Sequence, residues 1–177
     1  VDFGDSSVVG LDDLELRWFD YWLKGIDNGI VDEPPLRLFI MGANEWRDEH
    51  EWPLARTEYT RYYLHSEGRA NSIFGDGALT TDVPEGEGFD AYSYDPENPV
   101  PTLGGQSMFA ENTGPRDRRP IERRDDVLVY STAPLSRGLE VTGPVELVVY
   151  ATSSAPDTDF TATLVDVHPG GAAIHIC

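Results

Sequence analysis

The sequence is poor in cysteine and in long apolar runs. Its one cysteine, Cys177, excludes an intrachain disulfide and a cysteine-based metal site, and such sparse use of cysteine fits a cytoplasmic setting. No stretch approaches the roughly 18 to 20 consecutive apolar residues that a membrane-spanning helix needs. No basic segment followed by an apolar one marks a signal peptide after Val1.

Basic residues are also scarce. Asp and Glu number 32 against 13 Lys and Arg, which gives a net charge of -19, and Lys24 is the only lysine. Such a field repels nucleic acid and anionic membrane surfaces, so we exclude both as partners. The same composition is typical of chains adapted to high salt and of chains encoded by GC-rich genomes, and both explanations stay open.

Residues 11–24 carry the one clear helical period. Charged side chains follow one face of this segment and apolar ones cover most of the rest. The apolar set is Leu14, Leu16, Trp18, Phe19, Tyr21, Trp22 and Leu23. Gly25 is placed to end the helix, with the Lys24 cation in the last turn, where the helix dipole favours it. So wide an apolar arc predicts a helix packed against a large surface.

From Pro34 onward the pattern is that of short strands. Stretches rich in Val, Tyr, Phe, Thr and Leu alternate with segments rich in Gly, Pro, Asp and Asn. We expect strands at residues 36–41, 59–65, 91–94, 127–131, 139–141, 145–153 and 159–168, with another beginning at 174–177, and no further helix. This pattern predicts a mostly β fold, an antiparallel jelly-roll sandwich preceded by one helix. The unfinished last strand and the loop at residues 1–10 suggest a longer polypeptide.

No assembled catalytic group is visible. The nearest match to a G-x-S-x-G nucleophile elbow is GQSMF at residues 105–109, and it fails at its last position. The four histidines, His50, His65, His168 and His175, are scattered and form no H-E-x-x-H motif. A zinc pair of His168 and His175 on one hairpin is a minor alternative, and we expect no metal and no cofactor.

Acidic pairs leave two further possibilities open. Asp157 and Asp159 could hold a calcium ion, although an Asx turn at a strand entry is the favoured interpretation. A glycosidase dyad needs only that two carboxylates meet in space, and no motif supports one.

Seven segments, taken in order and spacing, carry a family resemblance. They are LRWFDYWLKG (16–25), FIMGANEWR (39–47), EWP (51–53), YYL (62–64), YDP (94–96), PVPTLGG (99–105) and DTDF (157–160). Together they resemble the cocaine-esterase-like branch of the X-Pro dipeptidyl-peptidase family, over about residues 1–177. The resemblance implies an α/β-hydrolase domain with a helical cap and a C-terminal, galactose-binding-like jelly roll.

On this resemblance, residues 1–33 are the end of the hydrolase domain and residues 34–177 are the jelly roll, truncated. The family's Ser, Asp and His precede the segment that matches Val1, so no residue here is assigned a catalytic role. The parent is expected to be a serine hydrolase of esters, amides or Xaa-Pro peptides that works through an acyl-enzyme. Its partners would be its own hydrolase domain and a small ester, amide or peptide substrate, and a homo-oligomer is compatible with it.

One binding role is transferred from the family. The apolar pair that follows the Leu-Gly-Gly motif lines the acyl pocket in esterase-like members, and here that pair is Met108 and Phe109. The equal alternative is that both residues plug the sandwich or a domain interface. A carbohydrate-binding jelly roll that uses Trp46 and Trp52, expected in loops, and a purely structural or assembly role remain the other hypotheses.

Overall fold

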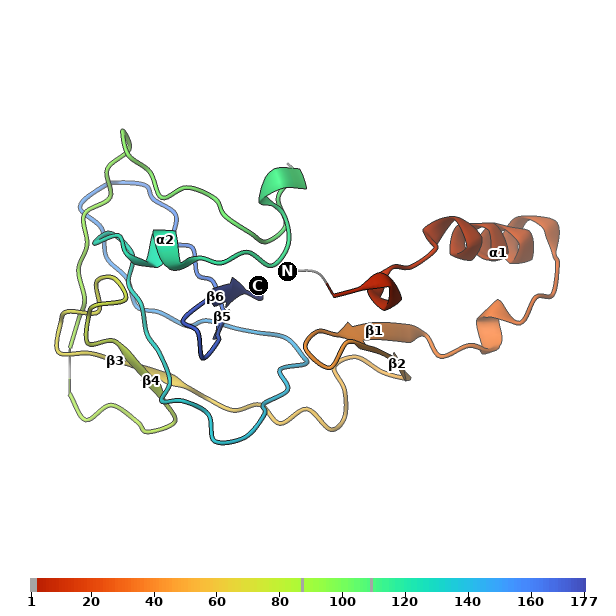
Figure 1. The fold of residues 1–177 in the computed structure, drawn as a ribbon, viewed down its shortest axis with the longest axis horizontal. Coiled ribbons are helices and arrows are strands. Elements are labelled where there is room, and N and C mark those ends of the chain that lie inside the picture. Colours follow the sequence, from red (N-terminus) through yellow and green to blue (C-terminus); the bar gives the residue numbers. More distant parts are fainter. Residues whose placement is uncertain (1–2, 87, 109) are drawn as a thin grey trace. The chain divides into compact units, whose positions relative to one another are not determined.

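The computed structural model describes residues 3–86, 88–108 and 110–177. Contacts divide these residues into two compact units. The first consists of residues 3–58 with 141–146, and the second of residues 59–140 with 147–177. The elements of both are drawn in Figure 1.

The first unit contains the predicted helix. Its elements are η1 (Asp5–Ser7), α1 (Leu11–Lys24), η2 (Ile30–Asp32), β1 (Leu36–Ile40) and β2 (Glu45–Glu49). Helix α1 has the predicted bounds, and Gly25 ends it in the left-handed region, at φ 69°. The Gly25 N–H donates to the Tyr21 carbonyl at 3.1 Å, and the next N–H donates to Asp20. A residue without a Cβ adopts this conformation without steric cost, which explains the stop.

The apolar arc of α1 is uncovered among the described residues. No residue of the helix is buried. Trp18 and Trp22 are 51% and 58% exposed, and their ring centroids lie 5.7 Å apart. Nothing within the described residues buries this arc, so the packing of α1 against a large surface stays a prediction.

β1 and β2 form an antiparallel hairpin, with Leu36 opposite Glu49 and Ile40 opposite Glu45 (Figure 1). Trp46, expected in a loop, is a strand residue. Its ring packs on Phe39 at 5.2 Å between centroids, and its Nε1–H donates to the Ser6 carbonyl at 2.6 Å. β2 could not be predicted from the sequence, because four of its five residues are charged and it lacks the apolar alternation of a strand.

The second unit is built from short strands. β3 (Tyr63–His65) pairs with β4 (Ala78–Thr80), and β5 (Val165–Val167) pairs with β6 (Ala173–His175), both antiparallel. The unit also holds η3 (Ala110–Asn112) and the short helix α2 (Arg119–Glu122). With β1–β2, the described residues thus form three two-stranded sheets, which agrees with a β-rich domain.

Several predicted strands are not formed among the described residues. Residues 91–94, 139–141 and 145–153 lie in no strand, residues 127–131 make only isolated bridges, and the stretches at 59–65 and 159–168 shorten to β3 and β5. The side chains of Leu147, Val148 and Tyr150 are 53%, 70% and 102% exposed. A strand exists only where a neighbour accepts its backbone hydrogen bonds, and apolar content does not supply that neighbour.

Helix α2 was missed for a different reason. Four residues are too few to display a helical period. Its only sequence signal is Pro120 in the first turn. Proline is tolerated there because the first N–H groups of a helix have no partner within the helix.

Few of the described side chains are buried. Among them, the apolar ones less than 5% exposed are Leu54, Ala70, Ile121 and Ala173. Buried polar groups accompany them: Glu49, at 8% exposed, accepts from Nη1 of Arg56 at 2.9 Å. No helix in the described ranges has the length and apolarity needed to cross a bilayer.

Candidate functional site

The Leu-Gly-Gly motif forms the base of a closed loop. Gly105 and Gly114 exchange two backbone hydrogen bonds of 2.9 Å each, and the Gly104 N–H donates to the Asn112 carbonyl at 3.0 Å. Gly104 and Gly105 both lie in the left-handed region, at φ 84° and 76°. Two consecutive residues of this conformation favour glycine strongly, so the motif is explained by the backbone it has to form.

Met108 lies on this loop. It is 98% exposed, so no described side chain covers it. Phe109 lies outside the described residues. The assignment of the Met108 and Phe109 pair to an acyl pocket therefore stays a prediction. Met108 does not plug a sandwich within the described part of the chain.

Two arginines tie both arms of the loop. Nη1 of Arg118 donates to the Leu103 carbonyl at 2.6 Å, on the incoming arm. Arg116 donates from Nε to the Thr113 carbonyl at 3.1 Å and from Nη2 to the Glu111 carbonyl at 2.9 Å, on the returning arm. Each guanidinium thus donates to backbone carbonyls of the loop.

These arginines are held in place by β6. The Arg118 N–H donates to the Ala173 carbonyl at 2.7 Å, and the His175 N–H donates to the Arg116 carbonyl at 2.9 Å. Segment 116–118 thus runs antiparallel to β6 on the edge opposite β5, with Asp117 facing Ile174. The loop base is therefore fixed to the β5–β6 hairpin.

Asp117 locks this pairing. Its carboxylate accepts the Ala173 N–H at 3.1 Å and the Arg119 Nε–H at 2.7 Å. Hydrogen bonds from the Arg119 side chain are the largest cause that lowers the pKa of Asp117, to about 2, against the opposing effect of burial. The carboxylate is consequently ionised at any physiological pH.

The ring of His175 rests on the two glycines. A Cβ added to Gly105 would lie 2.9 Å from Cε1 of His175, and one added to Gly104 would lie 3.1 Å from its Nδ1. Nδ1 is buried and has no hydrogen-bond partner. Burial, followed by the positive charge of Arg118, lowers the pKa of His175, and a hydrogen bond with the Leu103 backbone opposes them. The neutral imidazole is thus favoured.

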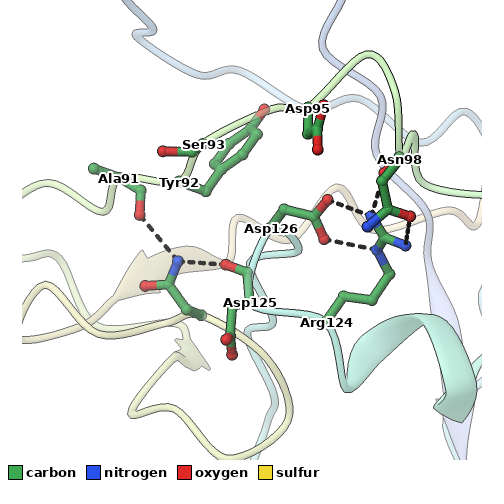
Figure 2. Close-up of a pocket in the computed structure, with 9 residues that line it drawn as sticks. Ala91, Tyr92, Ser93, Asp95, Asn98, Arg124, Asp125 and Asp126 are labelled. Carbon is green, nitrogen blue, oxygen red and sulfur yellow. Dashed lines mark hydrogen bonds and ion pairs between the residues drawn. The ribbon is translucent and has the colours of Figure 1, made fainter.

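A second feature is an open hollow of about 540 Å³. Figure 2 shows Arg124 between Asp126 and Asn98. Arg124 donates to the two Asp126 oxygens at 2.7 and 2.6 Å and to the Asn98 carbonyl at 2.6 Å. The Asn71 amide bridges the carbonyls of Ala91 and Asp125, each at 2.9 Å. The Arg124, Asp126 and Asn71 side chains are thus satisfied by the chain itself, and the residues that line the hollow include no histidine.

Within the described residues, His65 and His168 contact only nearby groups of their own hairpins. Nε2 of His65 lies 2.9 Å from the Asp82 carbonyl and 3.0 Å from Oγ1 of Thr80, and His168 lies 3.2 Å from Asp166. His168 directly follows β5 and His175 ends β6, so the predicted shared hairpin is confirmed. Across the described ranges, no three His, Cys, Asp or Glu groups are placed to hold a metal ion.

Comparison with known proteins gives the same family as the sequence motifs. Residues 28–177 match the X-Pro dipeptidyl-peptidase C-terminal non-catalytic domain. The chain belongs to this family. It is 50% identical over 165 residues to the cocaine esterase of a Rhodococcus species, which is 93% of this chain and 29% of that protein. The resemblance drawn from the seven segments is thereby confirmed.

More distant relatives carry related names. The chain is 33% identical over 168 residues to a putative serine esterase of Mycobacterium bovis, covering 91% of the chain and 24% of the relative. It is 25% identical over 153 residues to a putative Xaa-Pro dipeptidyl-peptidase of Streptomyces avermitilis, covering 86% and 20%. The chain therefore spans less than a third of the length of these relatives and is the non-catalytic C-terminal domain of a hydrolase family.

Sequence reasoning identified the loop but missed the residues that hold it. His175 was weighed only as a metal ligand, and Arg116 and Arg118 were not singled out. Adjacent glycines are a signal that something approaches the backbone closely. The pairing of segment 116–118 with β6 is a long-range contact, which no local pattern reports.

Proposed function

We propose that this chain is the non-catalytic C-terminal part of a serine hydrolase that cleaves esters, amides or Xaa-Pro peptides. The catalytic Ser, His and Asp belong to an α/β-hydrolase domain of the same polypeptide, and the reaction proceeds through an acyl-enzyme. Support comes from the match to the non-catalytic domain of this family and from relatives named as esterases and peptidases.

The observation that carries the proposal is the uncovered face of α1. A helix with two half-exposed tryptophans on its apolar arc needs a partner surface, since burial of each large apolar side chain contributes about 1.5 to 3 kcal/mol. A hydrolase domain in the same polypeptide supplies such a surface. In this arrangement residues 1–33 close the hydrolase domain and residues 34–177 form the jelly roll.

The loop that carries Met108 has a role in the same arrangement. Its exposed thioether forms one apolar wall of the acyl pocket, and Phe109 continues that wall. The carbohydrate-binding alternative keeps only half of its expected site: Trp52 is 49% exposed outside any strand, but Trp46 is packed on Phe39 and hydrogen-bonded to Ser6. A ring held in this way offers little surface for stacking on a sugar.

The test compares the chain alone with the chain joined to the hydrolase domain, using p-nitrophenyl esters of short and bulky acyl groups. The chain alone should be inactive. In the joined protein, Met108→Ala should lower kcat/KM for the bulky aromatic acyl ester about tenfold and leave the acetyl ester nearly unchanged, because a pocket wall discriminates by acyl size.

Met41→Ala is the matched control, since Met41 is 50% exposed in the turn between β1 and β2. It should change neither ester. Activity of the chain alone would refute the non-catalytic assignment. Equal kcat/KM ratios in Met108→Ala and wild type for the two esters would refute the pocket role.

A further inference from the structure

We propose that His175 is a proton-sensitive clamp on the Gly104-Gly105 turn, which fixes the loop that carries Met108 when its imidazole is neutral and loosens it when protonated. The clamp follows from the geometry of the turn. Its consequence for acyl selectivity rests on the proposed function.

The His175 ring packs closely against the two glycines of the turn. The His175 ring occupies the space into which a Cβ on either glycine would point, at 2.9 to 3.1 Å. Both glycines have positive φ, and Gly105 forms the hydrogen-bonded pair with Gly114 that closes the loop. The imidazole therefore lies against the backbone that sets the position of both arms.

The positive charge of Arg118 disfavours protonation of the His175 ring. Arg118 is fixed beside the ring through its hydrogen bond to the Leu103 carbonyl at 2.6 Å. Protonation would add a second positive charge next to this guanidinium and would ionise a ring whose Nδ1 is buried without a partner. Both effects favour the neutral ring in the closed loop.

The remaining charged groups around His175 do not offset this repulsion. Asp117, on the packed segment, is bound to Arg119, and the side chain of Arg116 is bound to the loop. Asp166 pairs with His168. From β5 the residue opposite His175 is Val165, and the glycine turn presents only backbone.

The direction of the pH effect follows from linkage. The pKa of His175 is lowered in the closed loop, first by burial and then by Arg118. The open loop therefore binds more protons, and closure is fully stabilised above the ordinary histidine pKa of about 6.5. Stabilisation is lost as the pH falls from there toward the lowered pKa.

The experiment exploits the two methionines, Met41 and Met108. The whole chain is labelled with ¹³C-methyl methionine and followed by NMR as the pH is lowered from about 8 to about 5, the range in which histidines titrate. The Met108 methyl resonance should shift with the same midpoint as the His175 ring, below about 6.5. The Met41 resonance, from the other compact unit, should not follow that midpoint.

Amide exchange measures the loop itself. The opening equilibrium at the Gly105 and Gly114 N–H groups should rise about tenfold for each pH unit over which only the open loop is protonated. His175→Phe keeps a ring on the glycines and removes the proton, so the pH dependence should vanish. His168→Gln, on the same hairpin and half-exposed, should leave it intact.

The outcomes are separable. A Met108 signal and glycine amides that ignore the His175 midpoint in the wild-type chain overturn the clamp without recourse to any variant. A pH dependence that persists in His175→Phe also overturns it. In the joined hydrolase, a selectivity for bulky acyl esters that changes with the His175 midpoint supports the link to the pocket. If NMR shows the clamp but the acyl selectivity does not change with the His175 midpoint, only the link to the pocket is overturned.

Discussion

Single carboxylates organise the second unit at the residue scale. Asp90 accepts hydrogen bonds from the Ser66 hydroxyl at 2.6 Å, the Ala70 N–H at 2.8 Å and the Tyr130 hydroxyl at 2.6 Å. These three donors come from different stretches of the chain, so one side chain ties them together. Burial alone would raise the pKa of Asp90, but the hydrogen bonds from Ser66, Tyr130 and Ala70 together lower it.

Replacement of this carboxylate should be costly. We expect Asp90→Asn to lower the free energy of unfolding by about 1 to 3 kcal/mol, because the amide accepts fewer hydrogen bonds and carries no charge. Urea unfolding measures the change, with the exposed Asp125→Asn as control. The wild-type advantage should persist above a pH of about 4 and fade below it, as the lowered pKa of Asp90 is approached. An advantage that is constant down to acid pH contradicts this account.

In the turn before β4, two glycines lie very close to the backbone of neighbouring segments. A Cβ on Gly77 would lie 2.0 Å from the Val129 carbonyl oxygen, and one on Gly75 would lie 2.2 Å from that of Arg69. Both obstacles are backbone atoms and cannot rotate away. Gly77 thus lets residues 127–131 lie along β4, where the Leu79 N–H donates to the Ser131 carbonyl at 2.9 Å, and Gly75 lets the turn close on residues 69–71.

This packing predicts the effect of one added methyl group. Gly77→Ala should destabilise the chain by about 3 kcal/mol, since the backbone must move to accommodate the Cβ. Gly86→Ala is the matched control, because nothing lies within 4 Å of its Cβ position. Comparison of the two urea midpoints checks the prediction, and equal midpoints would contradict it.

The elements also show what a sequence can and cannot predict. Helix α1 was placed correctly, end included, because its period and the Gly25 stop are local signals. β2 was hidden by its charges, and the strand expected at residues 145–153 is absent from the described structure because pairing depends on distant residues. For the same reason the Leu-Gly-Gly loop could be singled out, but not the histidine and arginines that hold it.

For the whole chain, exposed surface is the dominant property. Large apolar side chains are exposed in both compact units. They include the arc of α1 in the first unit and Leu147, Val148 and Tyr150 in the second. Exposed apolar surface of this kind is the mark of an interface, so association is the expected behaviour of the chain alone.

One substitution should weaken association through this surface without affecting the stability of the fold. Trp22→Glu should reduce concentration-dependent association of the chain, measured by analytical ultracentrifugation, and should leave its urea midpoint nearly unchanged because Trp22 is 58% exposed. Glu67→Gln, at an exposed position of the other unit, is the control. A large loss of stability in Trp22→Glu would instead mean that α1 is already packed in the chain.

Because Lys24 is the one lysine of the sequence, α1 carries a single site for selective chemical labelling. The ammonium of Lys24 lies on the last turn, 2.6 Å from Asp20, and its side chain remains 62% exposed. Amine-selective acylation of side chains therefore has one target in the sequence, and that target adjoins the bare tryptophans. A dye attached there would report, through quenching and anisotropy, the moment at which a neighbouring body settles over the helix.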